Sequence, residues 1–463
     1  MTKLRWLRRS PWTLAAVGVG ALAVGLSACN LDVTDPDIVT PEDAADPASI
    51  PAVIAGMVGD FQLAFDDWAR DGALFTDEFL LAGTFPTRQE MNQRQILVQN
   101  VTVNTDLWEK IHVNRFSADI AVDILSGVLG DPELDQEVIQ RGIAFGQYYG
   151  GYARVMLAEM FCQSILGGGE PEAVNYESAP IGPDARMGQA LTLFQQAEAS
   201  ATAAGEADLA EAASLGQAHA NMWLGNYSAA ASAAAAVSPS FLFDSEYSSN
   251  TPAQYNEIYT LTYGDTEVIR YSVGDGLLNS RNNERFPFYD EWVAVGLVNP
   301  DPGGSFLSFD RSVPVRLQTI YGGGNAPPTA VGQAAGMIIA SGFEADIIQA
   351  ENMYRSGDLA GAAALINSRI TNPALNPHGK TFSPVAFTGT FATDIVEIGR
   401  AYLAGLWLAG NRLHFVRRVL RNDGVDLFPP LTDGSDTAFP VPQQELDNND
   451  DMSQSCPSGP PWS

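Results

Sequence analysis

The chain has 463 residues, 46% of them hydrophobic, so it can bury a large core and is not a generally disordered protein. It contains 25 basic and 55 acidic residues, and this excess of negative charge excludes nucleic acid as an expected partner. The length would allow two or three domains, but no stretch reads as a clean flexible linker, so we expect one helical body with a large insertion.

The first 28 residues are predicted to be a lipoprotein signal peptide. Basic residues open the chain, an apolar run extends from Trp12 to Leu26, and small residues then precede Cys29. This order is typical of a lipobox, in which the cysteine is lipidated after cleavage, so we expect Cys29 to carry a lipid anchor to the membrane. The alternatives are an ordinary signal peptide in which the cysteine is incidental, and a simple membrane anchor.

Cleavage before Cys29 removes four basic residues and no acidic one, which leaves 21 basic against 55 acidic residues and a net charge of −34. Anionic headgroups repel such a body, so the protein should stand off the membrane surface. Residues 29–47 are polar and rich in Asp and Pro, as expected of a tether, and residues 48–463 are predicted to form a single helical domain.

Hydrophobic periodicity predicts helices through the first half of this domain. From Ile50 to Ala82 apolar residues recur at steps of three and four, whereas residues 83–104 lack such a period and are expected to form loops. The next helix should present one apolar face, made of Val113, Phe116, Ile120, Ile124 and Val128. Further helices are expected at about Glu133–Leu166, Met187–Ala203 and Ala207–Ala236, with a loop rich in Gly and Pro at 167–186.

The stretch from Gln217 to Val237 is predicted to be two helices that meet at a tight turn. Gly225 stands where the first helix needs a left-handed C-terminal residue, and Tyr227 and Ala230 open the second helix. Gly-Asn-Tyr-x-x-Ala is typical of a tetratricopeptide helix pair, and a second copy begins at Gly357. The copies are too far apart for a regular array of repeats of about 34 residues, so insertions must interrupt the scaffold.

From about residue 238 to residue 330 the composition shifts to Pro, Gly, Asn, Asp and aromatic residues, with one predicted strand at Glu267–Val273. We interpret this stretch as a large irregular insertion. Helices resume around Phe343 and extend from Phe391 to Leu420, and the tail from Asn422 is expected to be coil. The predicted fold class is therefore all-α, a tetratricopeptide-like scaffold with a large insertion.

Two cysteines remain after Cys29, at Cys162 and Cys456. In an oxidising compartment they can pair, which would tie the C-terminal tail to the helical body. The alternative is a buried, free Cys162 and an unpaired Cys456, because the sequence does not give the distance between them.

Several motifs carry a family resemblance. They are the helix pair with Ala350-Glu351, Arg355-x-Gly357-Asp358 and Ile366-Asn367-x-Arg369, the tail with Phe439-Pro440-Val441-Pro442 and Glu445, and the helices with Trp108, Ile111, Asn114 and Gly151 to Phe161. These stretches resemble the AE…R-x-GD…IN-x-R helix pair, the F-P-I-P-x-x-E signature and two helices of the SusD/RagB family of outer-membrane nutrient-binding lipoproteins. The resemblance covers nearly the whole chain from Cys29 to about Asn449.

One motif departs from the family. The family's E-G-x-R-x-x-D-L-x-R stretch corresponds here to residues 409–418, which begin Ala409-Gly410 and end Arg417-Arg418. Both of the motif's acidic positions are apolar in this chain, so the acidic partners of the family's ion pairs are missing there. The chain therefore looks like a divergent member, and the family's ligands are not carried over to it.

The resemblance implies a lipid-anchored outer-membrane protein at the cell surface of a diderm bacterium. It also implies a partner, a TonB-dependent outer-membrane barrel of the SusC type that the protein caps as a lid. In the family, ligand sites are built from the loop after the early helices and from the insertion between helix pairs. The ligand-binding candidates in these regions are Phe85, Arg88, Gln89, Asn92, Asn282, Arg285, Phe288, Tyr289 and Trp292.

The residue types at these positions suit sugars, because aromatic faces stack on sugar rings while amides and guanidinium groups hydrogen-bond to hydroxyls. The alternative is that these aromatic residues pack the insertion onto the scaffold. Trp223, Trp407 and Tyr227 lie at helical spacing and are expected in the core.

No enzyme motif is present, since neither a nucleophile elbow nor a Walker loop occurs. The pair Asp66-Asp67 could suggest glycosidase chemistry, but in so acidic a chain it is more simply surface charge. The histidines are scattered and lack the spacing of a helical zinc site; they are His112, His219, His378 and His414. We therefore predict no catalytic residue, no metal site and no cofactor.

Together these observations predict a non-catalytic lipoprotein that captures an oligosaccharide, or a peptide, and delivers it to the transporter. The rival hypothesis, from another class, is a helical-repeat scaffold or assembly lipoprotein that binds another protein and no small ligand.

Overall fold

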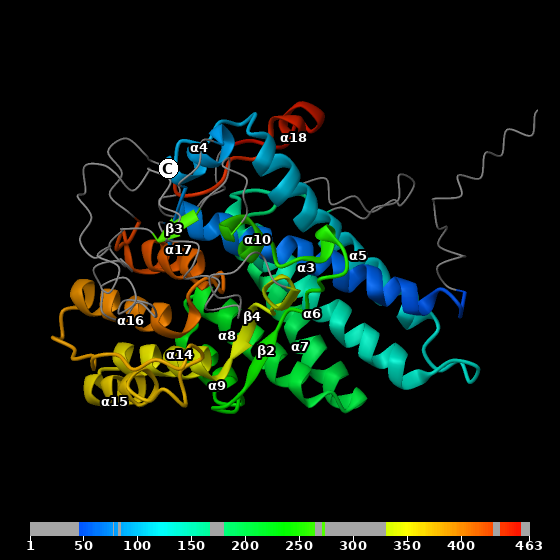
Figure 1. The fold of residues 1–463 in the computed structure, drawn as a ribbon. Helices are drawn as coiled ribbons and strands as arrows, with labels where there is room; N and C mark the ends of the chain where they lie inside the picture. Colours follow the sequence, from blue (N-terminus) through cyan, green and yellow to red (C-terminus); the bar gives the residue numbers. More distant parts are fainter. Residues whose placement is uncertain are drawn as a thin grey trace, which may run out of the picture. The chain divides into compact units, whose positions relative to one another are not determined.

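A computed structural model describes residues 46–76, 78–81, 85–166, 180–263, 271–273, 330–428 and 436–454. Contacts group the chain into two units, Met1–Ser49 and Ile50–Ser463, and the second contains every helix and strand described below. Helices make up most of this unit and the strands are short, which confirms the predicted all-α class (Figure 1).

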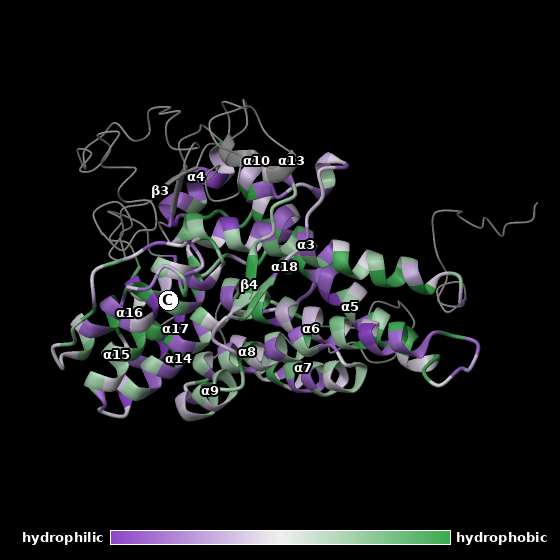
Figure 2. Cartoon of the chain, turned by 60° about the horizontal axis from the view of Figure 1, so that its bottom comes forward, coloured by the Kyte–Doolittle hydropathy of each residue, from purple (hydrophilic) through white to green (hydrophobic). Residues whose placement is uncertain are grey.

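Helices from distant parts of the chain pack together in this unit. The first half comprises α3 (Ile50–Phe75), α4 (Pro86–Gln93), the π-helix η1 (Val103–Glu109), α5 (Lys110–Gly127), α6 (Gln136–Met160), α7 (Pro183–Ala204), α8 (Ala207–Trp223) and α9 (Tyr227–Ala234). The second half comprises the 3₁₀ helix η2 (Pro252–Gln254), α10 (Glu257–Tyr263), α13 (Ala330–Gln333), α14 (Gly342–Arg355), α15 (Leu359–Ile370), α16 (Phe391–Leu406), α17 (Asn411–Asp423) and α18 (Gln443–Asn448). Residues of opposite hydropathy alternate around many of these helices (Figure 2), as expected where one face packs and the other meets water.

The strands among the described residues form two antiparallel pairs. β1 (Phe79–Leu81) pairs with β3 (Tyr271–Val273), and β2 (Leu242–Asp244) pairs with β4 (Ile338–Ser341). The strand predicted to end at Val273 is therefore present in its last three residues. Each pair joins chain segments that are far apart in sequence, and each is a sheet of only two strands. The pair of β1 and β3 is called here the β1–β3 clasp.

Both predicted helix pairs are present. The turn between α8 and α9 has Gly225 at a φ of +76°, and the turn between α14 and α15 has Gly357 at a φ of +91°. Glycine is required at both turns because residues with a Cβ atom rarely adopt such angles. Asp358 then caps α15, since its side chain accepts a hydrogen bond from the Gly361 N–H at 2.8 Å.

Aromatic residues from α3, α6 and α7 fill the space between these helices. Phe61 stacks on Tyr149 with 4.0 Å between ring centroids, and Tyr152 meets Phe194 edge-on at 5.4 Å. The Phe194 ring fits because α8 has a glycine at Gly216, where a Cβ atom would lie 2.7 Å from the ring. Small residues therefore set how closely these helices approach one another.

Three details of the N-terminal half differ from the sequence prediction. α3 ends at Phe75 rather than near Ala82, and the stretch expected to form only loops contains α4. The apolar face predicted for α5 is also wrong, because Val113 and Phe116 are 45% and 37% exposed, whereas Ala118 is fully buried. The buried face of α5 instead combines Ile111 and Leu125 with the small residues Ala118 and Ala121, which a search for large apolar residues alone does not find.

The single helix predicted from Phe391 to Leu420 is two helices, α16 and α17. The turn between them contains Leu408 and Gly410 at φ values of +65° and +81°. A Cβ atom on Gly410 would lie 2.1 Å from the Trp68 ring of α3, so this turn is pressed against α3. No proline marks the break, so hydrophobic periodicity by itself predicts one continuous helix here.

Residues 436–454, called here the C-terminal segment, lie along the helical body. The Phe439 N–H donates to the Met160 carbonyl at 2.8 Å, and the Gln443 N–H donates to the Val98 carbonyl at 3.0 Å. The Phe439 ring also packs on Phe75, with 4.6 Å between centroids. This segment is coil, as predicted for the tail, apart from the short α18.

Of the three aromatic residues expected in the core, Trp223 and Trp407 are buried, whereas Tyr227 is only partly buried and packs against the core. On α9, Ala230 and Ala234 are fully buried. Among the helices that the structure describes, none combines the length and the apolar character needed to span a membrane.

Candidate functional site

α4 and the residue before it hold the four ligand-binding candidates that the structure describes. Phe85 precedes the helix in an extended conformation and is half-buried, as is Asn92, while Gln89 is exposed. Arg88 is buried, and its guanidinium carbon lies 5.9 Å from the centre of the Phe85 ring. α4 thus leaves Gln89 and part of Phe85 and Asn92 accessible, with Arg88 beneath them.

Arg88 holds α4 in place from inside the protein. One terminal nitrogen donates to Asp71 of α3 at 2.8 Å, and the other donates to Asp106 of η1 at 2.9 Å. A buried guanidinium fixed by two carboxylates is pre-organised, because its planar fork matches the geometry of its partners. Arg88 therefore positions the accessible residues of α4.

A buried charge cluster on α3 extends this support. Arg70 forms ion pairs with Asp67 at 2.5 Å, with Asp71 at 2.9 Å and with Glu257 of α10 at 2.8 Å. Burial, followed by the charge on Glu257, raises the pKa of Asp66 well above its usual range. The sequence prediction that Asp66-Asp67 is surface charge is wrong, since both side chains are at most 1% exposed.

The remaining five ligand-binding candidates, Asn282, Arg285, Phe288, Tyr289 and Trp292, lie outside the described residues. The β1–β3 pair joins the insertion to the segment before α4. β3 belongs to the insertion and β1 lies just before α4, and Leu81 pairs with Tyr271. β3 lies beside α4 in both Figure 1 and Figure 2. A strand of the insertion is therefore paired with the strand that precedes α4.

A cavity of about 640 Å³ opens elsewhere, between η1, α5 and α18. Its lining is both aromatic and polar, and includes Trp108, Phe116, Gln444 and Glu445. A second cavity of about 350 Å³ is lined by Phe61, Phe145, Tyr149 and Phe243 with charged residues at its edge. Both are of the size and mixed character expected of small-ligand sites, so they are alternatives that a binding experiment must separate.

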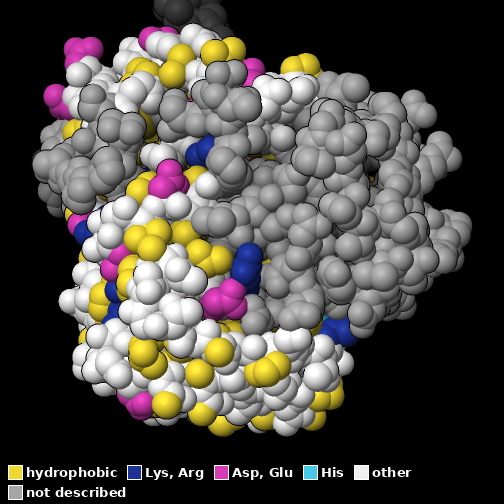
Figure 3. Space-filling model, turned by 90° about the vertical axis from the view of Figure 1, so that its left-hand side faces the viewer, with side chains coloured by type: hydrophobic (Ala, Val, Ile, Leu, Met, Phe, Trp, Pro, Cys, Tyr) yellow, Lys and Arg dark blue, Asp and Glu magenta, His cyan; other side chains and the backbone are white. Residues whose placement is uncertain are grey.

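Figure 3 shows one face of the molecule, where the described basic side chains are scattered and some lie beside acidic ones. On that part of the surface they do not gather into a patch of the kind that contacts phosphate backbones.

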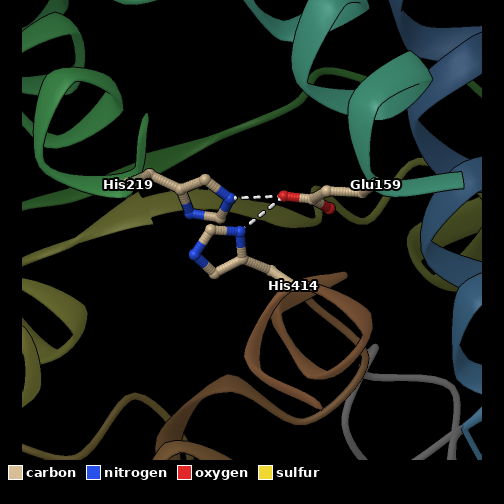
Figure 4. A group of neighbouring side chains, drawn as sticks. All are labelled: Glu159, His219 and His414. Carbon is tan, nitrogen blue, oxygen red and sulfur yellow. Dashed lines mark hydrogen bonds and ion pairs between the residues drawn. The ribbon is translucent and has the colours of Figure 1, made fainter. Parts of the chain in front are cut away.

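Sequence analysis missed a buried cluster of Glu159, His219 and His414 (Figure 4). Glu159 stands at the end of α6, His219 on α8 and His414 on α17, and all three side chains point toward one another. One carboxylate oxygen of Glu159 lies 2.7 Å from His219 Nε2 and 2.7 Å from His414 Nδ1. No local spacing links these positions, because three separate helices supply them.

The two histidines differ in protonation. Burial alone would lower the pKa of His219, but hydrogen bonds to Glu159 and Glu344 outweigh it and raise this pKa to about 9. Burial, followed by the positive charge on His219, lowers the pKa of His414 to about 3. The cluster at neutral pH therefore holds one carboxylate, one imidazolium and one neutral imidazole.

Cys162 is disulfide-bonded, and the cysteine joined to it lies outside the described residues. The C-terminal segment runs beside it, because the Ser453 N–H donates to Gln163 Oε1 at 3.1 Å and Gln163 Nε2 donates to Ser453 Oγ at 2.9 Å. Cys456 follows Ser453 by three positions. We therefore propose Cys456 as the partner of Cys162.

If this pairing is right, non-reducing digestion and mass spectrometry will recover the peptides of Cys162 and Cys456 as one cross-linked species. Cys456→Ser should lower the free energy of unfolding by about 2–4 kcal/mol, because the bond restricts the unfolded chain. Reduction should destabilise the parent protein by the same amount and leave Cys456→Ser unchanged. Two titratable thiols in the unreduced chain starting at Asn30 would contradict the pairing.

No protein-family model and no curated protein matches this sequence. Solved structures do match. A SusD-like protein from Bacteroides fragilis has a TM-score of 0.62 at 11% identity, covering 89% of this chain and 98% of that one. A SusD-like carbohydrate binding protein from Bacteroides vulgatus has a TM-score of 0.60 at 12% identity, covering 88% and 97%. A laminarin binding SusD-like protein has a TM-score of 0.53 at 14% identity, covering 88% and 99%.

The two helix pairs, α8–α9 and α14–α15, define a tetratricopeptide-like helical scaffold that an insertion interrupts. The comparisons make the class more specific, because the similarity extends over nearly the whole of each matched chain: the protein has the SusD-like fold. This confirms, at the level of the fold, the resemblance recognised from the sequence motifs.

Proposed function

We propose that the protein is a non-catalytic binding protein that captures an oligosaccharide at the edge formed by α4 and the β1–β3 clasp. The observation that carries the proposal is the pairing of Leu81 with Tyr271, which joins a strand of the insertion to the strand before α4. Two proteins of the same fold are described as carbohydrate binding and laminarin binding, which supports a glycan as the ligand.

The chemistry of the site supports the same ligand class. Phe85 offers part of an aromatic face, and Gln89 offers an exposed amide beside it. Arg88 and its two carboxylate partners hold this helix rigidly, so little conformational entropy should be lost on binding. Trp292, Tyr289 and Phe288 of the insertion would supply the opposing aromatic surfaces.

We also propose that Cys29 carries a lipid anchor, that the protein sits at the outer-membrane surface, and that it delivers its ligand to a TonB-dependent barrel. The apolar run and the small residues before Cys29 support the anchor. We place the surface for the barrel just before η1 and on α5, where Val101, Val113 and Phe116 are 55%, 45% and 37% exposed. Apolar side chains gathered on an exposed helical face are typical of protein contacts.

A binding screen tests the ligand proposal. The chain starting at Asn30 should bind at least one oligosaccharide from a panel of α- and β-glucans and not bind a matched panel of peptides. Phe85→Ala and Trp292→Ala should each weaken binding, by about 30-fold for a central aromatic residue that loses about 2 kcal/mol. Titration calorimetry measures the affinity directly.

Phe116→Ala serves as the matched control, because it removes a phenylalanine of the cavity between η1, α5 and α18. Loss of binding in Phe116→Ala with normal binding in the other two variants would move the site to that cavity. If no glycan or peptide binds, the exposed side chains of η1 and α5 favour the scaffold hypothesis. The next step would then be purification of the native membrane complex.

A further inference from the structure

We propose that Glu159, His219 and His414 form a binding site for a divalent transition-metal ion of the zinc type. Two imidazole nitrogens and a carboxylate oxygen are a donor set that zinc uses in proteins. One donor atom from each residue lies within 4.8 Å of the other two, and the side chains are 0%, 3% and 5% exposed. This inference does not depend on the proposed glycan function.

The spacing of the donor atoms is close to what a tetrahedral ion needs. Zinc bonds of about 2.0–2.2 Å place neighbouring ligand atoms about 3.3 Å apart. Each histidine nitrogen now lies 2.7 Å from the shared Glu159 oxygen. The nitrogens would have to withdraw by only about 0.6 Å to reach that zinc geometry, a shift that small side-chain rotations provide.

A fourth donor is close at hand. The second carboxylate oxygen of Glu159 is buried and has no hydrogen-bond partner among the described residues. A buried carboxylate oxygen without a partner is costly in a folded protein. Bidentate coordination by Glu159 would satisfy this oxygen and complete four donor atoms from three residues.

The surroundings orient the ligands as in known metal sites. His219 Nδ1 faces Glu344 of α14 at 3.3 Å, so this carboxylate can accept the Nδ1–H while Nε2 faces the ion. Metal-binding histidines usually donate their other ring N–H to such a group. The His219 and His414 rings lie 3.6 Å apart between centroids, and Arg417 donates to the Glu159 carbonyl, which fixes the end of α6.

Metal binding at this site exchanges one proton for the ion. Without metal, one proton lies between His219 Nε2 and Glu159, and the neutral His414 donates its Nδ1–H to the same oxygen. Binding forms bonds from the two nitrogens and the carboxylate to the ion, releases the His219 Nε2 proton to water, and moves the His414 proton from Nδ1 to Nε2, so that both rings stay neutral. The site would join α6, α8 and α17 directly, and α14 through Glu344, as a cross-link in the core.

The test uses the chain starting at Asn30, purified with a tag that contains no histidine and refolded with zinc, with cobalt or with a chelator. We expect one zinc ion per chain by elemental analysis, and with cobalt the visible absorption of a four-coordinate ion. Zinc should raise the Tm by several degrees relative to the chelator-treated protein, because it binds only the folded state.

His219→Gln and His414→Gln should each lose the bound ion and the Tm response to zinc. His112→Gln should keep both, since it replaces a largely buried histidine on α5 that is not part of the cluster. The parent protein by itself decides the matter, even if a variant fails to fold. If the zinc-treated parent shows no zinc above the level of the chelator-treated parent, no cobalt spectrum and no Tm shift, the cluster is a proton-sharing network and the proposal is wrong.

Discussion

Glu351→Gln is expected to lower the free energy of unfolding by about 3–5 kcal/mol, because it leaves the buried guanidinium of Arg418 without its carboxylate partner. Both carboxylate oxygens of Glu351 accept from Arg418 of α17, at 2.8 and 2.6 Å, and one of them also accepts from Arg355 at 2.9 Å. Glu351 is fully buried and Arg418 is 1% exposed. Glutamine keeps the shape of the side chain but not its charge, and its NH₂ group would face a donor. Urea unfolding at pH 7 measures the change.

The matched control is Glu397→Gln, which breaks a more exposed pair with Arg400 one helical turn away, at 2.7 Å. Exposed pairs contribute little, so this variant should stay within about 1 kcal/mol of the parent. Equal losses in the two variants would show that the burial of Glu351 has no special energetic consequence.

Gly410→Ala is expected to destabilise the protein by about 3 kcal/mol or more, through both backbone strain and overpacking. Gly410 has a φ of +81°, and its missing Cβ atom would lie 2.1 Å from the Trp68 ring. Trp68 is 1% exposed and packs beside Phe65, so it has little room to move away. Thermal unfolding followed by circular dichroism will show this as a marked fall in Tm.

Gly56→Ala provides the comparison, because nothing lies within 4 Å of its hypothetical Cβ atom and it sits inside α3. Alanine has a higher helix propensity than glycine, so this variant should gain about 0.5–1 kcal/mol. A loss in Gly56→Ala comparable to that in Gly410→Ala would mean that close contact with Trp68 is not the cause.

The sequence predicts the parts of this fold that depend on local chemistry. The turns at Gly225 and Gly357 are recognisable because a left-handed residue at a helix end needs glycine. The motifs then indicate the SusD-like fold, because they follow one another in the order found in the SusD/RagB family and extend over most of the chain. The helices themselves follow from periodicity, with errors at their ends.

Features that depend on contacts between distant helices could not be predicted. Asp66 and Asp67 look like surface charge until Arg70 and Glu257 are seen beside them. The break at Gly410 depends on the position of the Trp68 ring, which no local pattern reveals. The same holds for the candidate site, where Arg88 looks like a ligand-binding residue although two carboxylates from other helices hold it inside the protein.

The histidine cluster is the clearest case. His219 and His414 are far apart in the sequence and lack the spacing of two metal ligands on one helix, so no local pattern relates them. Their meeting depends on how α8 and α17 pack, and the shared partner Glu159 comes from a third helix. The one available signal in the sequence is that titratable residues stand on the inward faces of different helices, and this pattern could have suggested the cluster.

The C-terminal segment has a consequence for the order in which the protein is made. Phe439 lies against Phe75 and pairs with the backbone at Met160, yet it is synthesised after all the helices from α3 to α17. Until then, Phe75 and Phe161 lack an aromatic residue that packs on them, so a partly synthesised chain exposes apolar aromatic surface. The helical body is therefore incomplete until Phe439 has been made, and a chain stopped before this residue should be bound by chaperones or degraded by proteases.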